Sequence, residues 1–458
     1  MSRAATTRRA IASVRTEIEA WMRARRADRR FARFTGHFTA LEQITRRMLD
    51  AIEHDIARTE PDQPCGAVYE RCRTADVRLA VVARLHGWYA DKYDQRLDDG
   101  AATVLRAADE VVRSCWAEAF ASVDRDPPTG PLVYLDARFD AVATPRVSVP
   151  TDLRAAADVV VGQFVRELPI PLVALPGLCR SEPWWIVLAA HETGHHVQHD
   201  LDPGLVTRTR ETVAAAAGGD EADCWAAWAQ EVFADAFATL MVGPATTWAV
   251  EELQHGEPAR TVTMPSAGRR YPPPVIRTAL LGELAREAGC PHPGPGAADT
   301  AEWLDTVAAD AVPPPVHAAV AAHLPRVAQV ARAVVDMRID GTALSEVCGR
   351  DPGAFIAGGR VPRWVQALQT DSPVVPGRTE RAAARHGIAA GVEVYRARCA
   401  AATGPSDPLQ PLRVHLPTLL AACGPPGTLA ATAPPDIAKV ATLLTGRLLA
   451  EVGGEEMA

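Results

Sequence analysis

The stretch His191-Glu192-Thr193-Gly194-His195 follows an apolar run that begins at Trp184, so it falls on a segment expected to be buried. Residues four apart share one face of a helix, and His191 and His195 can therefore both contact one metal ion. Glu192 is displaced around the helix, where its carboxylate can hold a water molecule beside the metal. Because burial of such groups without partners is costly, the stretch predicts a metal site on a buried helix.

The sequence around this stretch sets the expected limits of the helix. It is predicted to run over about residues 182–199, with Ser181 as the N-cap and Pro183 in the first turn. Gly194 is less favourable than alanine in a helix interior by about 1 kcal/mol. We therefore expect a neighbouring segment to approach the helix closely at this glycine.

The third metal ligand is predicted on a second helix. Gln198 and Leu201 stand where the metzincin pattern has a glycine and a third histidine, which excludes that pattern. Within a later, almost wholly apolar stretch, Glu231 and Asp235 are four residues apart and share one face. Glu231 is expected to complete the metal shell. Asp235 is expected to accept the outer ring N–H of His191 and so fix its tautomer.

Alternatives to this ligand set remain open at the level of sequence. The two carboxylates of the second helix could instead form an exposed pair on an amphipathic helix. Asp200, Asp220 and Glu221 are fallback ligands. His196 and His199 are interpreted as polar surface groups, or as hydrogen-bonding neighbours of the ligands, rather than as ligands themselves.

The composition of the chain argues against a nucleic-acid-binding, a membrane or a secreted protein. Hydrophobic residues make up 48% of the 458-residue chain, charged residues 23%, and the net charge is -8, which argues against a nucleic-acid or anionic-membrane partner. The arginine cluster from Arg23 to Arg33 is interpreted as a solvated helix face rather than a nucleic-acid contact. The nine dispersed cysteines contain no C-x-x-C pair, which predicts reduced thiols and a cytoplasmic protein. Neither a secretory signal nor an apolar stretch approaching 18 residues is found, so no membrane association is expected.

The chain is expected to contain three regions. Residues 1–125 show helical spacing of apolar residues, 126–290 contain the metal motifs, and 297–458 read as alanine-rich helices between proline-rich connections. Segments 131–136 and 170–176 are β-prone, and the prolines of the second favour an edge strand. The expected fold is mainly α (α+β): a central region with a small β-sheet and two motif-bearing helices, flanked by N- and C-terminal helical regions.

The motifs together resemble those of a known class of proteins. His191-Glu192-x-x-His195, followed on a second helix by Glu231-x-x-Ala-Asp235, resembles the gluzincin peptidases. The second element is similar to that of the HtpX-like and CAAX-prenyl-protease group. That group has a third element, H-P-x-x-x-x-R, where this chain has Tyr271-Pro-x-x-x-x-Arg277. The resemblance covers about residues 131–285 and implies a zincin-like core.

This resemblance implies zinc-dependent hydrolysis of peptide bonds in a protein or peptide substrate. Zn²⁺ would be held by His191, His195 and Glu231. Glu192 would take the proton of the attacking water as general base and pass it to the leaving amine. The membrane spans of the similar group are absent here, so its membrane-embedded substrates are not expected.

The same resemblance implies that two further residues, Tyr271 and Arg277, belong to the site. Tyr271 occupies the place of the group's histidine and would donate a hydrogen bond to the oxyanion, since a phenol can serve in that role. The alternative is a surface aromatic between prolines. Arg277 would support the site or bind substrate. An extended substrate is expected to pair with an edge strand, for which 131–136 and 170–176 are the candidates.

Two other functions stay open. The first is a helical interaction or regulatory protein whose zincin core is structural or inactive, which the large helical flanks favour. The second is a regulatory peptidase whose flanks recognise one protein partner. The intact general-base position of Glu192 argues against a purely structural site.

Overall fold

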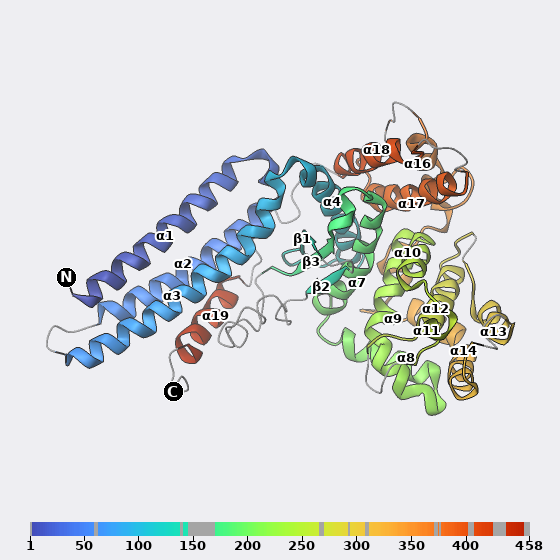
Figure 1. The fold of residues 1–458 in the computed structure, drawn as a ribbon, viewed down its shortest axis with the longest axis horizontal. Helices are drawn as coiled ribbons and strands as arrows, with labels where there is room; N and C mark the ends of the chain where they lie inside the picture. Colours follow the sequence, from blue (N-terminus) through green and yellow to red (C-terminus); the bar gives the residue numbers. More distant parts are fainter. Residues whose placement is uncertain are drawn as a thin grey trace.

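The computed structural model describes residues 2–58, 63–137, 141–144, 170–264, 270–291, 294–306, 311–370, 374, 377–401, 407–424 and 437–452. Within these ranges the chain is mostly helical, with one three-stranded and one two-stranded sheet, which confirms the predicted mainly α composition. The molecule is elongated, with a helical bundle at one end and a larger body at the other (Figure 1).

None of the helices that the structure describes combines the length and the hydropathy needed to cross a lipid bilayer.

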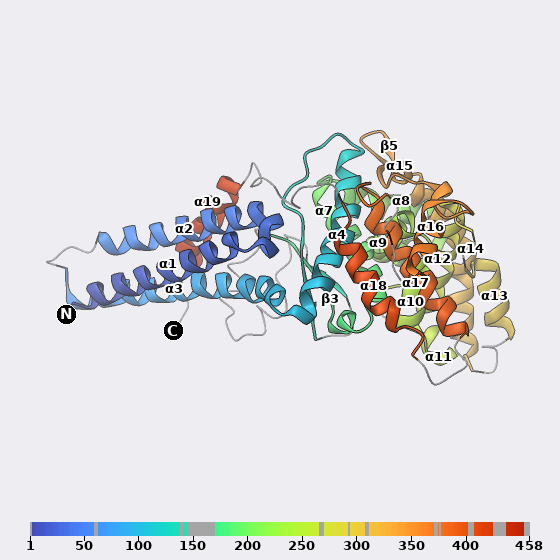
Figure 2. The ribbon, with the colours of Figure 1, turned by 90° about the horizontal axis from the view of Figure 1, so that it is seen from above.

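The bundle joins the two ends of the described chain. It is formed by α1 (Arg3–Ala27), α2 (Thr35–Ala57), α3 (Cys65–Asp94) and, from the other end of the sequence, α19 (Ile437–Glu451), which packs against α2 (Figure 2). Within region 1–125, apolar residues of α2 recur at helical spacing and are fully buried in this bundle: Leu41, Ile44, Met48, Ile52 and Ile56. Helical periodicity in the sequence is therefore confirmed, but the contribution of α19 could not be seen from it.

A three-stranded sheet lies between the bundle and the larger body. β3 (Leu172–Pro176) is central, parallel to β1 (Leu132–Asp136) and antiparallel to β2 (Val142–Thr144). The prediction that the 170–176 segment is an edge strand is therefore wrong. Its prolines lie before the strand and at its last residue, where they do not interrupt the interior of the hydrogen-bonded ladder.

The sheet separates two hydrophobic cores. Because side chains alternate across a strand, each strand contributes to both cores. The residues that join the bundle core are Leu132, Tyr134, Leu172 and Ala174. The residues that join the core of the larger body are Val133, Leu135, Val173 and Leu175. Both faces of β1 and β3 are thus buried, which explains their continuous apolar sequences.

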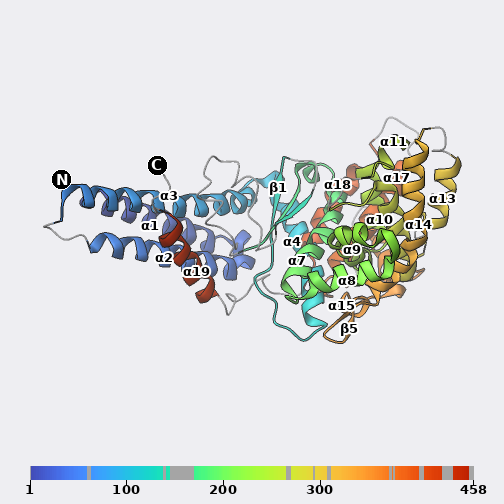
Figure 3. The ribbon, with the colours of Figure 1, turned by 90° about the horizontal axis from the view of Figure 1, so that it is seen from below.

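The larger body is built around two neighbouring helices, α7 (Leu188–Asp200) and α9 (Ala222–Val242) (Figure 3). The remaining helices pack around this pair: α4 (Asp99–Ala121), α8 (Leu205–Ala217), α10 (Ala245–Gln254), α11 (Pro258–Thr261), α12 (Pro274–Glu287), α13 (Ala297–Thr306), α14 (Pro314–Val335), α15 (Leu344–Val347), α16 (Arg360–Leu368), α17 (Ala383–Ala401) and α18 (Gln410–Ala421). The two-stranded sheet, β4 (Arg338–Ile339) with β5 (Thr342–Ala343), follows α14.

The beginning of the first motif helix differs from the prediction. Residues Pro183–Val187 form a 3₁₀ helix (η4), and α7 begins only at Leu188. Ser181 does not cap either element, because its hydroxyl donates to the carbonyl of Leu178. The second motif helix, α9, ends at Val242, with Gly243 at φ 62° just after its last residue.

The two hydrophobic cores cross the limits of the three predicted regions. α4 belongs to region 1–125 by sequence, yet its apolar face lies in the core of the larger body, as do faces of α14, α17 and α18. The bundle core is instead formed by α1 to α3, the distant α19, the short segment after α1 and one face of β1 and β3. Apolar periodicity identifies a buried helix face but not the partner that covers it.

Candidate metal centre

The two motif helices lie in close contact at Gly194. A Cβ atom placed on Gly194 would be 3.0 Å from the Cα atom of Ala234 and 3.2 Å from Phe237. The predicted close approach at this glycine is therefore confirmed. It brings the histidine face of α7 against the carboxylate face of α9.

Three side chains meet at this contact. One ligand atom from each of His191, His195 and Glu231 lies within 4.8 Å of the other two, an arrangement that could hold a metal ion. The Oε2 atom of Glu231 is 3.4 Å from Nε2 of His191, and Oε1 is 3.7 Å from Nε2 of His195. Glu231 is 1% exposed, and its Oε2 atom is buried without a hydrogen bond among the described residues. Two imidazoles and one carboxylate with an unfilled acceptor fit a cation such as Zn²⁺.

Asp235 links the cluster to a buried arginine. Its Oδ1 atom lies 2.9 Å from Nδ1 of His191, on the side of the ring away from Glu231. Arg277 of α12 donates from Nε and Nη2 to the two Asp235 oxygens, each at 2.8 Å. Burial would raise the pKa of Asp235, but Arg277 and His191 outweigh it and hold the pKa far below its usual range. Asp235 is thus a fixed acceptor that orients the His191 ring.

The charges of the cluster are strongly coupled. Burial opposes a charge on His191, yet Asp235 and Glu231 raise the pKa of its imidazole to about 10. Burial also opposes a charge on Glu231, but His191, His195 and Arg277 lower its pKa to about 2. Burial lowers the pKa of His195 to about 3. The cluster therefore holds one proton on His191 that a bound metal cation would displace.

Glu192 stands beside the cluster without belonging to it. It is 6% exposed, and its carboxylate accepts a hydrogen bond from the backbone N–H of Ala143 in β2. Burial raises the pKa of this carboxyl to about 7, although the charge of His191 lowers it. A carboxylate of this kind suits a group that takes up and releases a proton near neutral pH.

The cluster opens into a cavity of about 390 Å³. Its walls are β2, the end of η4 with α7, the helix α10 and the segment that carries Tyr271. The apolar part of the wall consists of Ala141, Ala143, Val187, Leu188, Ala249, Val250 and Leu253. The cluster is therefore reached through a cavity between β2 and α10.

The two residues of the third motif, Tyr271 and Arg277, differ in their exposure and in their contacts. Tyr271 is 56% exposed and lines the cavity, and its hydroxyl makes no hydrogen bond within the described residues. Partial burial and the charges of Glu231 and Glu192 raise its pKa, so the phenol stays protonated and can donate. Arg277 lines the same cavity but is 7% exposed, with its Nε and Nη2 committed to Asp235. Its geometry therefore favours support of the site over contact with substrate.

The histidines after the motif lie elsewhere than expected. His196 is fully buried, and its Nε2 atom is 2.9 Å from the carbonyl oxygen of Leu172 in β3, so the prediction of a surface group is wrong for it. The reason is that α7 packs on the sheet, which one sequence cannot show. His199 is half-buried and lines the cavity, as does Arg270, which no motif indicated. Arg270 donates to the side chain of Gln230 at 3.2 Å.

The fallback ligands are not part of the site. Among the described residues, the donor cluster does not include Asp200, Asp220 or Glu221. β2 and its Ala143 were missed by sequence reasoning, because a three-residue strand without a charged side chain leaves no signal.

Comparison of the chain with models of protein families, with curated proteins and with solved structures gave no match.

Proposed function

We propose that this chain is a zinc-dependent endopeptidase. The observation that carries the proposal is the cluster of His191, His195 and Glu231 with Glu192 beside it, all four lining one cavity. A set of two imidazoles and one carboxylate is typical of a catalytic zinc site that keeps a position open. When bound, Zn²⁺ supplies Lewis acidity, which lowers the pKa of a ligated water towards about 7 and polarises a carbonyl.

The residues around the cluster supply the proton transfers. Glu192 takes a proton from the attacking water and delivers it to the leaving amine. The N–H of Ala143 holds the Glu192 carboxylate in place. Tyr271 donates a hydrogen bond to the oxyanion, in the place of the histidine of the similar peptidases. Asp235 and Arg277 keep the His191 ring oriented.

The substrate is an extended peptide that pairs with β2. This strand is the edge of the sheet on the side of the cavity, which Ala141 and Ala143 line. An edge strand offers backbone N–H and C=O groups that an extended peptide can bind by adding a strand. The edge differs from the two segments considered from sequence, since β3 is central and β1 lies on the far side of it.

A structural metal site in a helical interaction protein is the second candidate. It is favoured by the bundle of α1, α2, α3 and α19, whose core lies apart from the metal cluster. Against it stands Glu192, which lines the cavity and has no function in a purely structural site.

The test combines metal analysis with proteolysis of an unfolded protein, measured with and without chelator. Glu192→Gln is expected to keep one zinc per chain and lose cleavage by about 10² to 10⁴-fold, because only proton transfer is removed. Glu231→Ala is expected to lose zinc. Glu211→Gln, an exposed glutamate on α8, serves as the matched control and should behave as wild type.

The outcomes separate the candidates. Cleavage that persists in zinc-loaded Glu192→Gln would contradict the role of Glu192. Unchanged zinc content in Glu231→Ala would remove Glu231 from the ligand set. A wild-type chain that binds zinc but cleaves no unfolded protein supports the structural site instead.

A further inference from the structure

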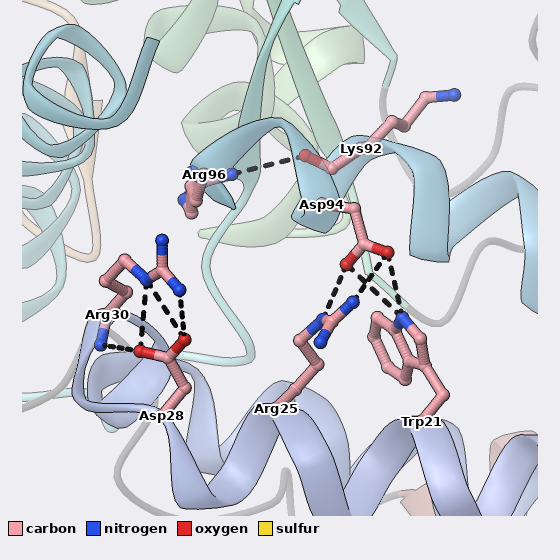
Figure 4. A network of polar contacts seen from close by, with 7 residues as sticks. All are labelled: Trp21, Arg25, Asp28, Arg30, Lys92, Asp94 and Arg96. Carbon is pink, nitrogen blue, oxygen red and sulfur yellow. Dashed lines mark hydrogen bonds and ion pairs between the residues drawn. The ribbon is translucent and has the colours of Figure 1, made fainter. Parts of the chain in front are cut away.

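A second cavity, of about 680 Å³, lies where the bundle meets the larger body. Its lining combines residues of the 3₁₀ helices η1 (Arg29–Phe34) and η2 (Gln95–Leu97) with residues of α4 and α18. Five of its lining residues are arginines and one is an aspartate: Arg29, Arg30, Arg33, Arg96, Arg106 and Asp109. We call this cavity the arginine pocket. Figure 4 shows Arg30 and Arg96 at the end of the bundle, with the polar contacts around them.

Part of this positive charge is neutralised by neighbours. Arg96 and Asp109 form a buried ion pair at 2.7 Å. Arg30 pairs with Asp28 at 2.6 Å, as Figure 4 shows. Arg33 pairs with Glu110. Three guanidinium groups therefore have a carboxylate partner.

The other guanidinium groups of the pocket have no carboxylate partner within the described residues. Arg29 and Arg106 make no ion pair or hydrogen bond there. The Nη1 atom of Arg33 is buried and also lacks a hydrogen-bond partner. Guanidinium groups that converge on one cavity repel each other, and an anion bound between them relieves this repulsion. The carboxylates of Asp28, Asp109 and Glu110 each pair with another arginine of the pocket and leave Arg29 and Arg106 without an ion pair in the described part of the chain.

A solvated helix face explains only part of the arginine cluster predicted from the sequence. Arg23 and Arg26 agree with that interpretation, since they form exposed ion pairs with Glu19 and Glu42. Arg29 and Arg30 are exposed as well, but with the half-buried Arg33 they also line a cavity that includes arginines from distant parts of the sequence.

We propose that the arginine pocket binds a small anion that carries several phosphate groups. Guanidinium groups match phosphate oxygens in pairs, and the arginines of η1 and of α4 can each contact a different phosphate. The hydroxyls of Thr103 and Thr418, which also line the pocket, add donors. The volume suits a small molecule and is too confined for a nucleic-acid duplex. The anion is either an inorganic oligophosphate or the phosphate chain of a nucleotide.

Such a ligand would tie together three parts of the fold. η1 follows the first bundle helix, α4 belongs to the larger body and α18 lies near the C-terminal end of the described chain. Arg96 also donates from Nη2 to the carbonyl of Val133 in β1, so the wall of the pocket contacts the sheet. Bound anion is therefore expected to raise the melting temperature of the full chain.

The test is calorimetric titration of the full chain with inorganic tripolyphosphate at low ionic strength. Saturable binding of one anion per chain is expected, with loss of affinity as salt is added. Arg106→Gln and Arg29→Gln should each weaken binding by about tenfold, because each removes a charged contact to phosphate. Arg46→Gln, an exposed α2 arginine outside the pocket, is the matched control and should bind as wild type.

A nucleoside triphosphate in a second titration distinguishes the two sources of the anion. Affinity equal to that of tripolyphosphate assigns the pocket to the phosphate chain alone, and tighter binding assigns it to a nucleotide. The proposal is overturned by absence of tripolyphosphate binding, or by equal weakening in Arg46→Gln and Arg106→Gln. It is also overturned by binding of single-stranded RNA that tripolyphosphate does not displace. None of these readouts depends on peptidase activity.

Discussion

Asp235 shows how a single carboxylate can serve the metal site without binding the metal. It is fully buried and contacts His191 on one side and Arg277 on the other. Both contacts come from helices that are distant in sequence, so the residue couples the orientation of a ligand to the packing of α12. The sequence predicted the contact with His191 but not the contact with Arg277.

We expect Asp235→Asn to weaken zinc binding by about 10 to 100-fold, because the His191 ring loses its charged acceptor. The same change leaves the Arg277 guanidinium buried without its partner and should destabilise the fold. Competition with a chelator measures the affinity, and thermal unfolding measures the stability.

The double variant Asp235→Asn/Arg277→Met separates these two effects. Removal of the unpaired charge should recover part of the stability while zinc affinity stays low. Recovery of both quantities together would contradict a role for Asp235 in orienting His191.

His386 provides a second residue-scale prediction, away from the metal centre. It lies in α17 with 3% exposure, and burial together with Arg385 and Arg360 lowers the pKa of its imidazole to about 3. An unfolded histidine has a pKa of about 6.5. Below about pH 6.5, His386 therefore binds fewer protons in the folded chain than in the unfolded chain. The stability that the neutral, buried imidazole contributes is fully present above about pH 6.5 and is lost as the pH falls towards 3.

Between pH 7 and pH 5, His386 is expected to reduce the free energy of unfolding by about 1 to 2 kcal/mol. The melting temperature of wild type should therefore fall more over this interval than that of His386→Gln. Equal falls in the two proteins would show that His386 does not carry this pH dependence.

At the scale of elements, the contact between α7 and α9 depends on one glycine. A methyl group on Gly194 would press on the backbone of Ala234, which cannot rotate away as a side chain can. Gly194→Ala is therefore expected to destabilise the chain by about 1 to 3 kcal/mol and to weaken zinc binding, since the two ligand-bearing helices must separate. Thermal unfolding and chelator competition measure both effects.

Gly87 in α3 is the matched control for this substitution. A Cβ atom placed there meets nothing within 4 Å. Gly87→Ala should therefore stabilise the chain by about 0.5 to 1 kcal/mol, through helix propensity alone. A loss of stability as large as that of Gly194→Ala would contradict the role of the close helix contact.

At the scale of the whole molecule, Arg78 of α3 connects the C-terminal end of α19 to the bundle. Its guanidinium donates to the carbonyls of Val452 at 2.9 Å and Leu449 at 2.6 Å, and pairs with Asp55 at 3.0 Å. Arg78 is 8% exposed, so these carbonyls lose their donor if it is removed. The residue thus joins segments separated by more than 370 positions.

Arg78→Met is expected to weaken this docking by about 2 to 3 kcal/mol, because charged hydrogen bonds to buried carbonyls are lost. Hydrogen exchange in residues 437–451 should accelerate, while zinc content stays unchanged. Arg73→Met, on the same helix, removes only an exposed pair with Glu70 at 3.7 Å and should have almost no effect. Unchanged exchange in Arg78→Met would show that apolar packing alone holds α19.

The features that could be predicted from the sequence are those that depend only on residue spacing within one helix. The histidines four apart on α7, the carboxylates four apart on α9, and the buried stripe of α2 all follow from spacing along one helix. Spacing of this kind fixes a shared face, whatever the rest of the chain does. The glycine at position 194 even indicated that another segment must come close.

The predictions that were wrong are those that depended on which element of the fold packs against a given segment. The segment at β3 was expected at an edge because of its prolines, but its place depends on β2, whose sequence carries no strand signal. His196 was expected either at the surface or beside the ligands, but the packing of α7 on β3 buries it against the carbonyl of Leu172. In both cases the missing information was which element lies opposite.

The sequence by itself determined the chemical groups of this protein: two imidazoles, three carboxylates and the helices that present them. The tertiary structure alone decided which of these groups converge, which strand forms the edge beside them, and that α19 returns to the N-terminal bundle. It also brought five arginines from three elements around one cavity. The physical reason is that helical periodicity is a local property of the chain, whereas the partner of each buried face is chosen by the packing of all the elements together.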